Sequence, residues 1–461
     1  MSRFTNGLIL AAVTVTALPA PTLAQLGSYN PMPGPQATVV IRNARIVPVS
    51  APVIENGTVV ISGGKILAVG TTVSVPSGAQ VIDGTGLHVY PGMMDAGTSM
   101  GLSEIPQGAA STVDNSETGR FNPNVQALNG FNPHSAHIGV TRVVGITQVV
   151  SRPSGGLVSG QAGVFQLAGS TAPAMAMVPR AALVIQLPSA SFGGGFGGGP
   201  GGVGGNTQEV NRTREQQLDS IRTLFADAMA YGKAHAAWGS DRTLPRPAHD
   251  VVLESLQAVI SGEMPVIFPA DRAADIRAAI TFAETLKVRP IIMGGRDAVS
   301  VAALLKEKNV PVVLTRVMDL PSREDDPYDI NFTAPARLVS AGVKFAITSG
   351  DAGAEVRNLP YHAGMAAAFG LSREDALRSV TLWPAEIFGV ADRVGSIEVG
   401  KIANLVVTTG DLLEATTDTR YLFIDGRSVP LDTKHTQLYE MFKDRQQALC
   451  AATGGSTGCT D

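Results

Sequence analysis

Residues 265–314 read PVIFPADRAADIRAAITFAETLKVRPIIMGGRDAVSVAALLKEKNVPVVL, and this stretch decides the fold class. The segments 265–268, 290–293 and 310–314 are continuously apolar, which is typical of strands buried on both faces. The segments between them, 272–286 and 297–308, have the composition and length of helices. Repeated strand–helix units of this kind predict a parallel sheet covered by helices.

The same alternation extends outward in both directions from about residue 91. Further apolar strands are predicted at 146–150, 182–185 and 343–347, and further helices at 213–230, 249–261, 362–370 and 373–380. Units that repeat across about 300 residues suit a closed barrel better than an open sheet. We therefore expect an α/β fold in which residues 92–395 form a (β/α)8 TIM-like barrel.

The two ends of the chain have sequence patterns typical of β-strands instead. Residues 58–62 and 65–69 flank Gly63-Gly64, a hairpin signal because paired glycines accept the positive φ of tight turns. Residues 403–408 and 420–424 show the same strand pattern near the other end. We predict that residues 37–91 and 396–431 together form a small β-sandwich domain, followed by a C-terminal helix and tail over 432–461.

The first 24 residues have the pattern of a cleavable signal peptide. Arg3 precedes an apolar stretch at 8–13, and the small residues Thr22 and Ala24 match the cleavage pattern. A membrane anchor, the alternative, needs about 20 unbroken apolar residues, and prolines interrupt this run. We expect an exported, periplasmic protein without a membrane span.

Composition excludes several classes of partner. The net charge is −4 and the charges are interspersed, so no basic face indicates nucleic acid or an anionic membrane. Aromatic residues make up only 5%, too few to suggest stacking platforms for carbohydrate. The run 193–205 contains ten glycines and predicts a mobile loop, without the pattern of a phosphate-binding loop.

The only cysteines are Cys450 and Cys459, in a tail rich in Gly, Ser and Thr. They could close a small loop by a disulfide in an oxidising compartment. Two exposed thiols are the equally open alternative.

Three stretches carry a resemblance to a known family. They are residues 81–84 leading to 91–95, residues 349–352 after the last predicted barrel strand, and the series 381–389, 395–401 and 405–407. Their order and spacing resemble the amidohydrolase superfamily, specifically its exported imidazolonepropionase-like members.

The resemblance implies a divalent metal at the barrel mouth that activates water for attack on an amide-like carbon. In the family the first strand supplies two histidines, written D-x-H-x-H. Here Gly97 and Ser99 stand at those two positions, and the fifth and sixth strands end without histidine at Ala270 and Gly294. Asp351 alone matches the expected set. We therefore assign no metal ligand and leave the cofactor open, since the usual metal of the family is doubtful here. A carbamylated lysine cannot be placed either.

Two histidines could belong to a different metal site. His134 and His137 are spaced i, i+3 and would share one helical face. Solvated imidazoles in the first turn of a helix are the simpler interpretation. His362 lies close to Asp351 in sequence and could line the pocket, although a structural role is also open to it.

Catalytic groups of barrels cluster at strand C-termini, and this rule gives the candidate site. Asp351 is the candidate catalytic residue, as a general base whose alternative role is capping the loop at 351–355. The candidate substrate-binding residues are Thr98, Ser99, Gln161, Asp271, Arg272, Arg296, Arg316, Arg357, Tyr361 and His362.

Two functions follow from these residues. The first is hydrolysis of a non-peptide C–N bond, of cyclic amide or N-acyl type, in a small molecule, with an atypical or reduced metal site. The second is a catalytically inactive relative that binds a ligand or serves as a scaffold. The metal site separates them, whereas the substrate and the oligomeric state are left open by the sequence.

Overall fold

The computed structural model describes residues 33–105, 110–189, 207–315 and 317–452. The expected signal peptide at 1–24, the glycine-rich run 193–205, Arg316 and Cys459 lie outside these ranges. No helix in the described ranges is long and apolar enough to cross a membrane.

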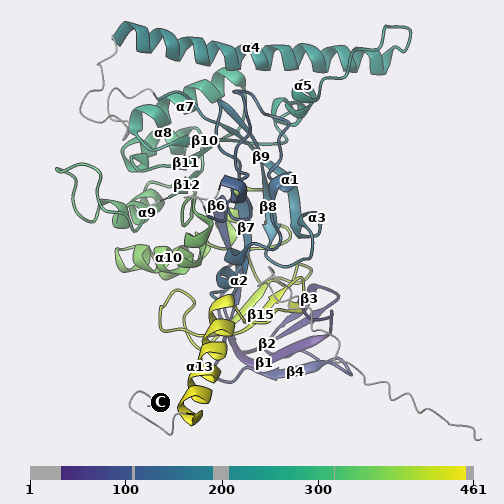
Figure 1. The fold of residues 1–461 in the computed structure, drawn as a ribbon, viewed down its shortest axis with the longest axis vertical. Coiled ribbons are helices and arrows are strands. Elements are labelled where there is room, and N and C mark those ends of the chain that lie inside the picture. Colours follow the sequence, from purple (N-terminus) through teal and green to yellow (C-terminus); the bar gives the residue numbers. More distant parts are fainter. Residues whose placement is uncertain (1–32, 106–109, 190–206, 316, 453–461) are drawn as a thin grey trace, which may run out of the picture.

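Eight strands form a nearly closed barrel in the middle of the molecule (Figure 1). In chain order they are β6 (Met93–Thr98), β7 (Ile146–Ser151), β8 (Val158–Gln166), β9 (Ala176–Ile185), β10 (Val266–Ala270), β11 (Pro290–Gly294), β12 (Val312–Leu314) and β13 (Phe345–Ile347). Neighbours in the chain are neighbours in the sheet, from β6 to β13. The TIM-like barrel expected from the strand–helix repeat is confirmed.

One strand departs from the repeat. β8 is antiparallel to both β7 and β9, so a hairpin replaces a strand–helix unit here. The sequence interpretation treated residues 154–161 as a loop after the second strand, because glycines at 155, 156, 160 and 163 obscure the strand pattern. The backbone of Gly160 has φ +129, and a Cβ there would lie 2.7 Å from the Val125 carbonyl oxygen, so only glycine fits.

Helices cover the outside of the barrel. Those of the second half are α7 (Ala273–Leu286), α8 (Ala302–Glu307), α9 (Ile330–Ser340), α10 (Leu359–Ala368), α11 (Arg373–Arg378) and α12 (Leu382–Ile387). Those of the first half are α1 (Ala127–Gly130), α2 (Ala136–Arg142), α3 (Ala172–Met175), α4 (Thr207–Ser240), α5 (Val251–Ser255) and α6 (Gln257–Ile260). Three 3-10 turns add η1 (Ala110–Thr112), η2 (Ala298–Val301) and η3 (Gly353–Asn358). The predicted helix 213–230 is longer as α4, which crosses one end of the barrel in Figure 1, and 249–261 is divided into α5 and α6 at Leu256.

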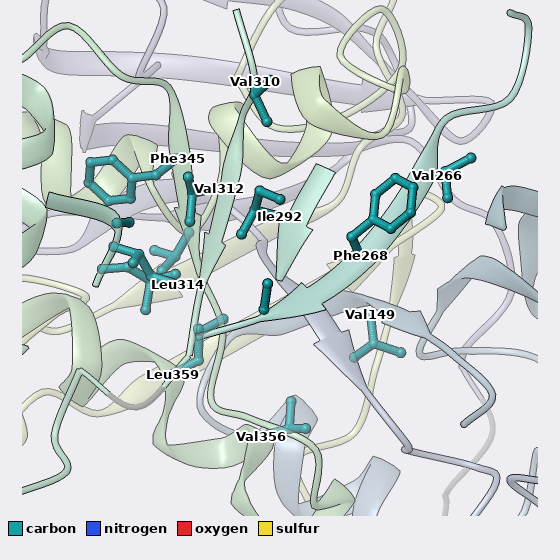
Figure 2. Packing of buried hydrophobic residues seen from close by; sticks show 14 of the residues in the cluster. Val149, Val266, Phe268, Ile292, Val310, Val312, Leu314, Phe345, Val356 and Leu359 are labelled. Atoms are coloured by element: carbon teal, nitrogen blue, oxygen red, sulfur yellow. The ribbon is translucent and has the colours of Figure 1, made fainter. Parts of the chain in front are cut away.

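Strand residues alternate between two apolar layers, because successive side chains point to opposite faces. Met94, Ile267 and Met293 belong to one cluster inside the barrel. Val266, Phe268 and Ile292 belong to another, between the strands and the helices, and Figure 2 shows part of this outer layer. Both faces of the strands are therefore buried, which explains their continuously apolar sequence.

Both ends of the chain join one mixed sheet beside the barrel. Its strands are β1 (Val39–Ile46), β2 (Ile54–Ser62), β3 (Lys65–Gly70), β4 (Gln80–Asp83), β5 (His88–Pro91), β14 (Leu405–Thr408), β15 (Thr419–Ile424) and β16 (Arg427–Ser428). β5 pairs antiparallel with β14, which joins the N-terminal strands to the C-terminal ones. α13 (Lys434–Ala452) follows and lies beside this sheet in Figure 1.

Candidate functional site

A cavity of about 980 Å³ opens at the C-terminal ends of the barrel strands. Its floor includes Met293 and Gly294 from β11 and Ala270 from β10. Its charged lining residues and its one histidine come from the loops after the strands and from α7 and α10; they are Arg152, Asp271, Arg272, Asp275, Asp319, Asp351, Glu355 and His362. The position matches the face on which barrels of this kind build their sites.

Asp351 lies at the mouth of this cavity, four residues after β13. Its backbone carbonyl accepts hydrogen bonds from the Ser99 amide at 2.8 Å and the Ser99 hydroxyl at 2.6 Å. Its carboxylate forms an ion pair with Arg152, and the Asp351 side chain is 74% exposed. The backbone of Asp351 thus connects the last strand to the first, while its carboxylate remains in contact with water.

Asp95 is a second carboxylate between the same two strands, and it is fully buried. It accepts hydrogen bonds from the Thr348 hydroxyl at 2.5 Å, the Ser349 hydroxyl at 2.6 Å, the Ser349 amide at 3.0 Å and the Gly97 amide at 3.0 Å. Burial raises the pKa of Asp95, and these hydrogen bonds act in the opposite direction. The network joins β6 to the segment after β13 and closes the barrel.

His362 contributes a buried imidazole to the cavity wall. The residue is 7% exposed, and its Nδ1 has no hydrogen-bond partner among the described residues. Burial lowers the pKa of His362, although Asp319 and Glu355 oppose that shift. Burial thus favours the neutral form of the His362 imidazole.

The ends of β6 and β11 meet closely inside the barrel. A Cβ at Gly97 would lie 2.5 Å from the Met293 Cε and 3.2 Å from its Sδ. The Met293 side chain therefore fills the space into which a larger residue at position 97 would project. Met293 itself is almost completely buried.

Comparison with known proteins agrees with this architecture. The model of the Amidohydrolase family matches residues 269–429. A solved amidohydrolase from Thermotoga maritima MSB8 is 27% identical, with a TM-score of 0.74 over 85% of this chain and 99% of its own. The family model and this structural likeness support membership of the amidohydrolase superfamily. No curated protein sequence matches it.

Other solved amidohydrolase-type proteins share the fold at lower identity. A prolidase crystallised with N-methylphosphonate-L-proline is 19% identical, with a TM-score of 0.51 over 85% of this chain and 99% of its own. Another amidohydrolase is 18% identical, with a TM-score of 0.50 over 85% and 98% of the two chains.

The metal expected of an amidohydrolase does not fit the residues present. Gly97 stands where the first imidazole would be, and the Met293 thioether occupies the adjoining space. Among the described residues, no group of three or more His, Cys, Asp or Glu side chains lies close enough to hold a metal ion. A thioether is a soft ligand that does not suit the harder divalent ions, which prefer oxygen ligands. We derive no catalytic step through a metal.

His134 and His137 do not supply an alternative metal site in the described structure. Only His137 lies within α2, and its Nε2 lies 3.0 Å from the Glu104 carbonyl oxygen and 3.8 Å from the Glu104 carboxylate. His137 and Glu104 together contribute one imidazole and one carboxylate, fewer than the four ligands that a structural zinc site uses.

The structure places five of the predicted site residues on the large cavity. They are Asp351, Asp271, Arg272, Tyr361 and His362. Ser99 lines a smaller adjoining cavity of about 240 Å³, together with Arg152 and Asp351. Thr98 is buried beneath them, and its hydroxyl lies 3.4 Å from the Asp351 carbonyl oxygen. The catalytic and binding roles of these residues stay predictions.

The other predicted residues do not come together there. Gln161 is buried within β8 and donates to the Pro123 carbonyl at 2.8 Å, away from the cavity lining. It was chosen as part of a loop, and the β8 hairpin places it inside the fold instead. Arg296 and Arg357 are likewise outside the lining, and Arg316 lies outside the described residues.

Sequence reasoning missed Arg152, the partner of Asp351. Arg152 directly follows β7, so the rule that places site residues at strand ends would have found it. The candidate list passed from Ser99 to Gln161 and did not include it. Asp95 was noted only as part of the family motif, since its role depends on partners more than 250 positions away.

Proposed function

We propose that this amidohydrolase-superfamily protein binds a small organic molecule in the barrel cavity and does not hydrolyse it by the metal-assisted route of the family. The observation that carries the proposal is the contrast between the closely packed barrel interior and the open cavity above it. Gly97 and Met293 pack together where the first imidazole would project, whereas the cavity above them is about 980 Å³. A volume of this size is typical of small-molecule sites.

The state of Asp351 supports binding over turnover. A carboxylate becomes an effective general base near neutral pH when it is buried away from water. The Asp351 side chain is 74% exposed and is paired with Arg152. Neither feature prepares it to remove a proton from water.

Metal content and turnover, measured on the same preparation, test this proposal. The protein would be purified without chelators or a metal-binding tag, analysed by plasma mass spectrometry, and assayed with cyclic amides and N-acyl amino acids. We expect no stoichiometric metal, no turnover, and saturable binding by calorimetry. About one metal ion per chain, lost together with amide hydrolysis in Asp351→Ala, would overturn the proposal.

Hydrolysis of a non-peptide C–N bond in a cyclic amide or N-acyl compound is the second candidate. Membership of the amidohydrolase superfamily favours it, as does the position of Asp351 after the last barrel strand. It predicts turnover that Asp351→Asn abolishes while Arg337→Gln, outside the cavity lining, leaves it unchanged. Equal rates in all three proteins would exclude Asp351 as the catalytic group.

We also propose that the protein is exported to the periplasm after cleavage behind Ala24. The support is the signal-peptide pattern of residues 1–24. N-terminal sequencing of the protein recovered from a periplasmic fraction should begin at Gln25. An intact Met1 in the cytoplasmic fraction would contradict this proposal.

A further inference from the structure

A buried guanidinium at the cavity mouth points to the chemical class of the ligand. Arg152 directly follows β7, and its amide donates to the Thr98 carbonyl at 3.0 Å, which fixes the start of its side chain beside β6. Only 9% of the side chain is exposed. Burying a charged group away from water is costly unless its hydrogen-bonding groups find partners.

The partners that Arg152 has in the described structure are few. Guanidinium carries five N–H donors. The terminal nitrogen Nη2 donates to the Asp351 carboxylate, whereas Nε is buried without a hydrogen-bond partner among the described residues. The side chain thus retains capacity for a second acceptor, and carboxylates satisfy guanidinium best because they accept two parallel hydrogen bonds.

The one acidic partner that Arg152 has among the described residues is also easy to displace. The Asp351 side chain is 74% exposed, so its carboxylate can return to water without breaking buried contacts. Breaking the ion pair therefore costs little free energy on the Asp351 side. Releasing Arg152 without a replacement would leave a buried charge unpaired, so any exchange requires an incoming anion.

The space around the pair admits such an anion. Arg152 and Asp351 line both the large cavity and the adjoining cavity of about 240 Å³. Next to Asp351, Gly350 faces open space, since a Cβ there would meet no atom within 4 Å. A ligand group in either cavity can approach the guanidinium from this side.

The rest of the large cavity limits the charge of that ligand. Asp271, Asp275, Asp319 and Glu355 also line it, against one further guanidinium, that of Arg272. A second negative charge on the ligand would be repelled by these carboxylates. The cavity therefore favours one carboxylate on an otherwise neutral or cationic molecule.

We propose that Arg152 anchors the carboxylate of a small monocarboxylic ligand, with Asp351 as the resident counter-ion that this carboxylate displaces. The inference rests on the proposed ligand-binding function and names its ligand class. No covalent step is involved.

Calorimetry with a matched pair of probes tests the anchor. N-acetyl-L-phenylalanine and N-acetyl-L-phenylalaninamide have nearly the same shape and differ in the charge of one end. The wild-type protein should bind the acid at least about tenfold more tightly than the amide. N-acetyl-L-glutamate, with two carboxylates, should bind more weakly than the first probe.

Variants at both members of the ion pair sharpen the test. Arg152→Gln should remove the preference for the acid, and Arg152→Lys should retain part of it because lysine keeps the charge without the planar fork. Asp351→Asn should tighten binding of the acid several-fold, because no resident carboxylate competes. Arg337→Gln is the matched control, since Arg337 is exposed on α9 and outside the cavity lining. Thermal unfolding of each variant checks that it is folded.

The outcomes separate the anchor from the wider function. Equal binding of acid and amide, or weaker binding of the acid by Asp351→Asn, would overturn the anchor while leaving a ligand-binding protein. Binding of neither probe at millimolar concentration would overturn the anchor and remove support for the ligand-binding function as well.

Discussion

Asp95 and Asp351 lie at the same closure of the barrel, and their environments are opposite. Asp95 is fully buried and accepts hydrogen bonds from Thr348, Ser349 and Gly97. The Asp351 side chain is 74% exposed, and its carboxylate pairs with Arg152 alone among the described residues. The comparison teaches that resemblance to a family motif does not assign a role: the first aspartate closes the barrel, and the second is the one available to a ligand.

A similar contrast exists between the residues beneath the cavity and those that line it. Gly97 and Met293 close the barrel interior beneath the cavity. A metal-holding site would need imidazoles there. The structure instead has hydrogen-bonded and closely packed apolar residues beneath a charged cavity.

The largest expected effect comes from removing the buried carboxylate. Asp95→Ala should lower the free energy of unfolding by about 3 kcal/mol or more, because the buried Thr348 hydroxyl, the partly buried Ser349 hydroxyl and two amides would lose their acceptor. Urea unfolding measures this loss. Asp351→Asn is the matched control and should cost less than Asp95→Ala, because the exposed amide oxygen can still accept a hydrogen bond from Arg152. Similar losses in the two variants would remove the distinction.

A smaller effect should follow from adding one methyl group to the floor. Gly97→Ala should cost about 1–3 kcal/mol, because the new Cβ overlaps the Met293 side chain. The same substitution should cost less in a Met293→Ala background, and a double-mutant cycle measures the difference. Gly239→Ala in α4 is the control, since a Cβ there meets nothing within 4 Å. Additive effects of the Gly97 and Met293 substitutions would show that the two residues do not compete for space.

The pH dependence of stability should report the burial of Asp95. Burial raises the folded-state pKa of Asp95 above its unfolded value, so the folded protein binds more protons between those two values. Stability contributed by this group should therefore fall as pH rises from about 4 through the folded pKa, by at most about 1.4 kcal/mol per pH unit. Urea unfolding at several pH values would show this slope in the wild type and its loss in Asp95→Asn. An unchanged slope in the variant would contradict the assignment.

The smallest effect is expected at Glu398, near the β-sheet domain. The pH dependence of its contribution to stability should have the opposite sign to that of Asp95. The Ser396 hydroxyl, with further help from Lys401, lowers the pKa of Glu398 from 4.5 to about 2. Its contribution to stability is present above pH 4.5 and is lost as pH falls toward about 2. The Glu398 side chain is 47% exposed, so solvent screening limits the effect to under about 1 kcal/mol. Glu398→Gln should flatten the acid limb of the unfolding curve, and a steeper limb would contradict this prediction.

The fold was largely predictable because its signals are local. Apolar runs such as 265–268 and 290–293 became β10 and β11, and the segment 272–286 became α7 almost residue for residue. β8 was missed, because its glycines hide a strand that pairs with both neighbours in the antiparallel sense. α9 was missed as well, since Pro335 lies inside it.

The candidate site was only partly predictable. The strand-end rule indicated Asp271, and closeness to Asp351 in sequence indicated His362; both line the cavity, while their roles stay predictions. Gln161 was misplaced because the local pattern could not show that its segment forms a strand inside the barrel wall. Arg152 was missed although it follows a correctly predicted strand.

The sequence by itself determined the barrel, the β-sheet contributed by both chain ends, and the absence of histidine at the positions where the family's ligands are expected. These conclusions depend on residue identity and on periodicity over short segments. Only the tertiary structure decided that Asp95 bonds to Thr348 and Ser349, that Met293 fills the space beside Gly97, and that Arg152 pairs with Asp351. The physical reason is distance along the chain: Arg152 and Asp351 are 199 positions apart, and the closure of the barrel brings them together.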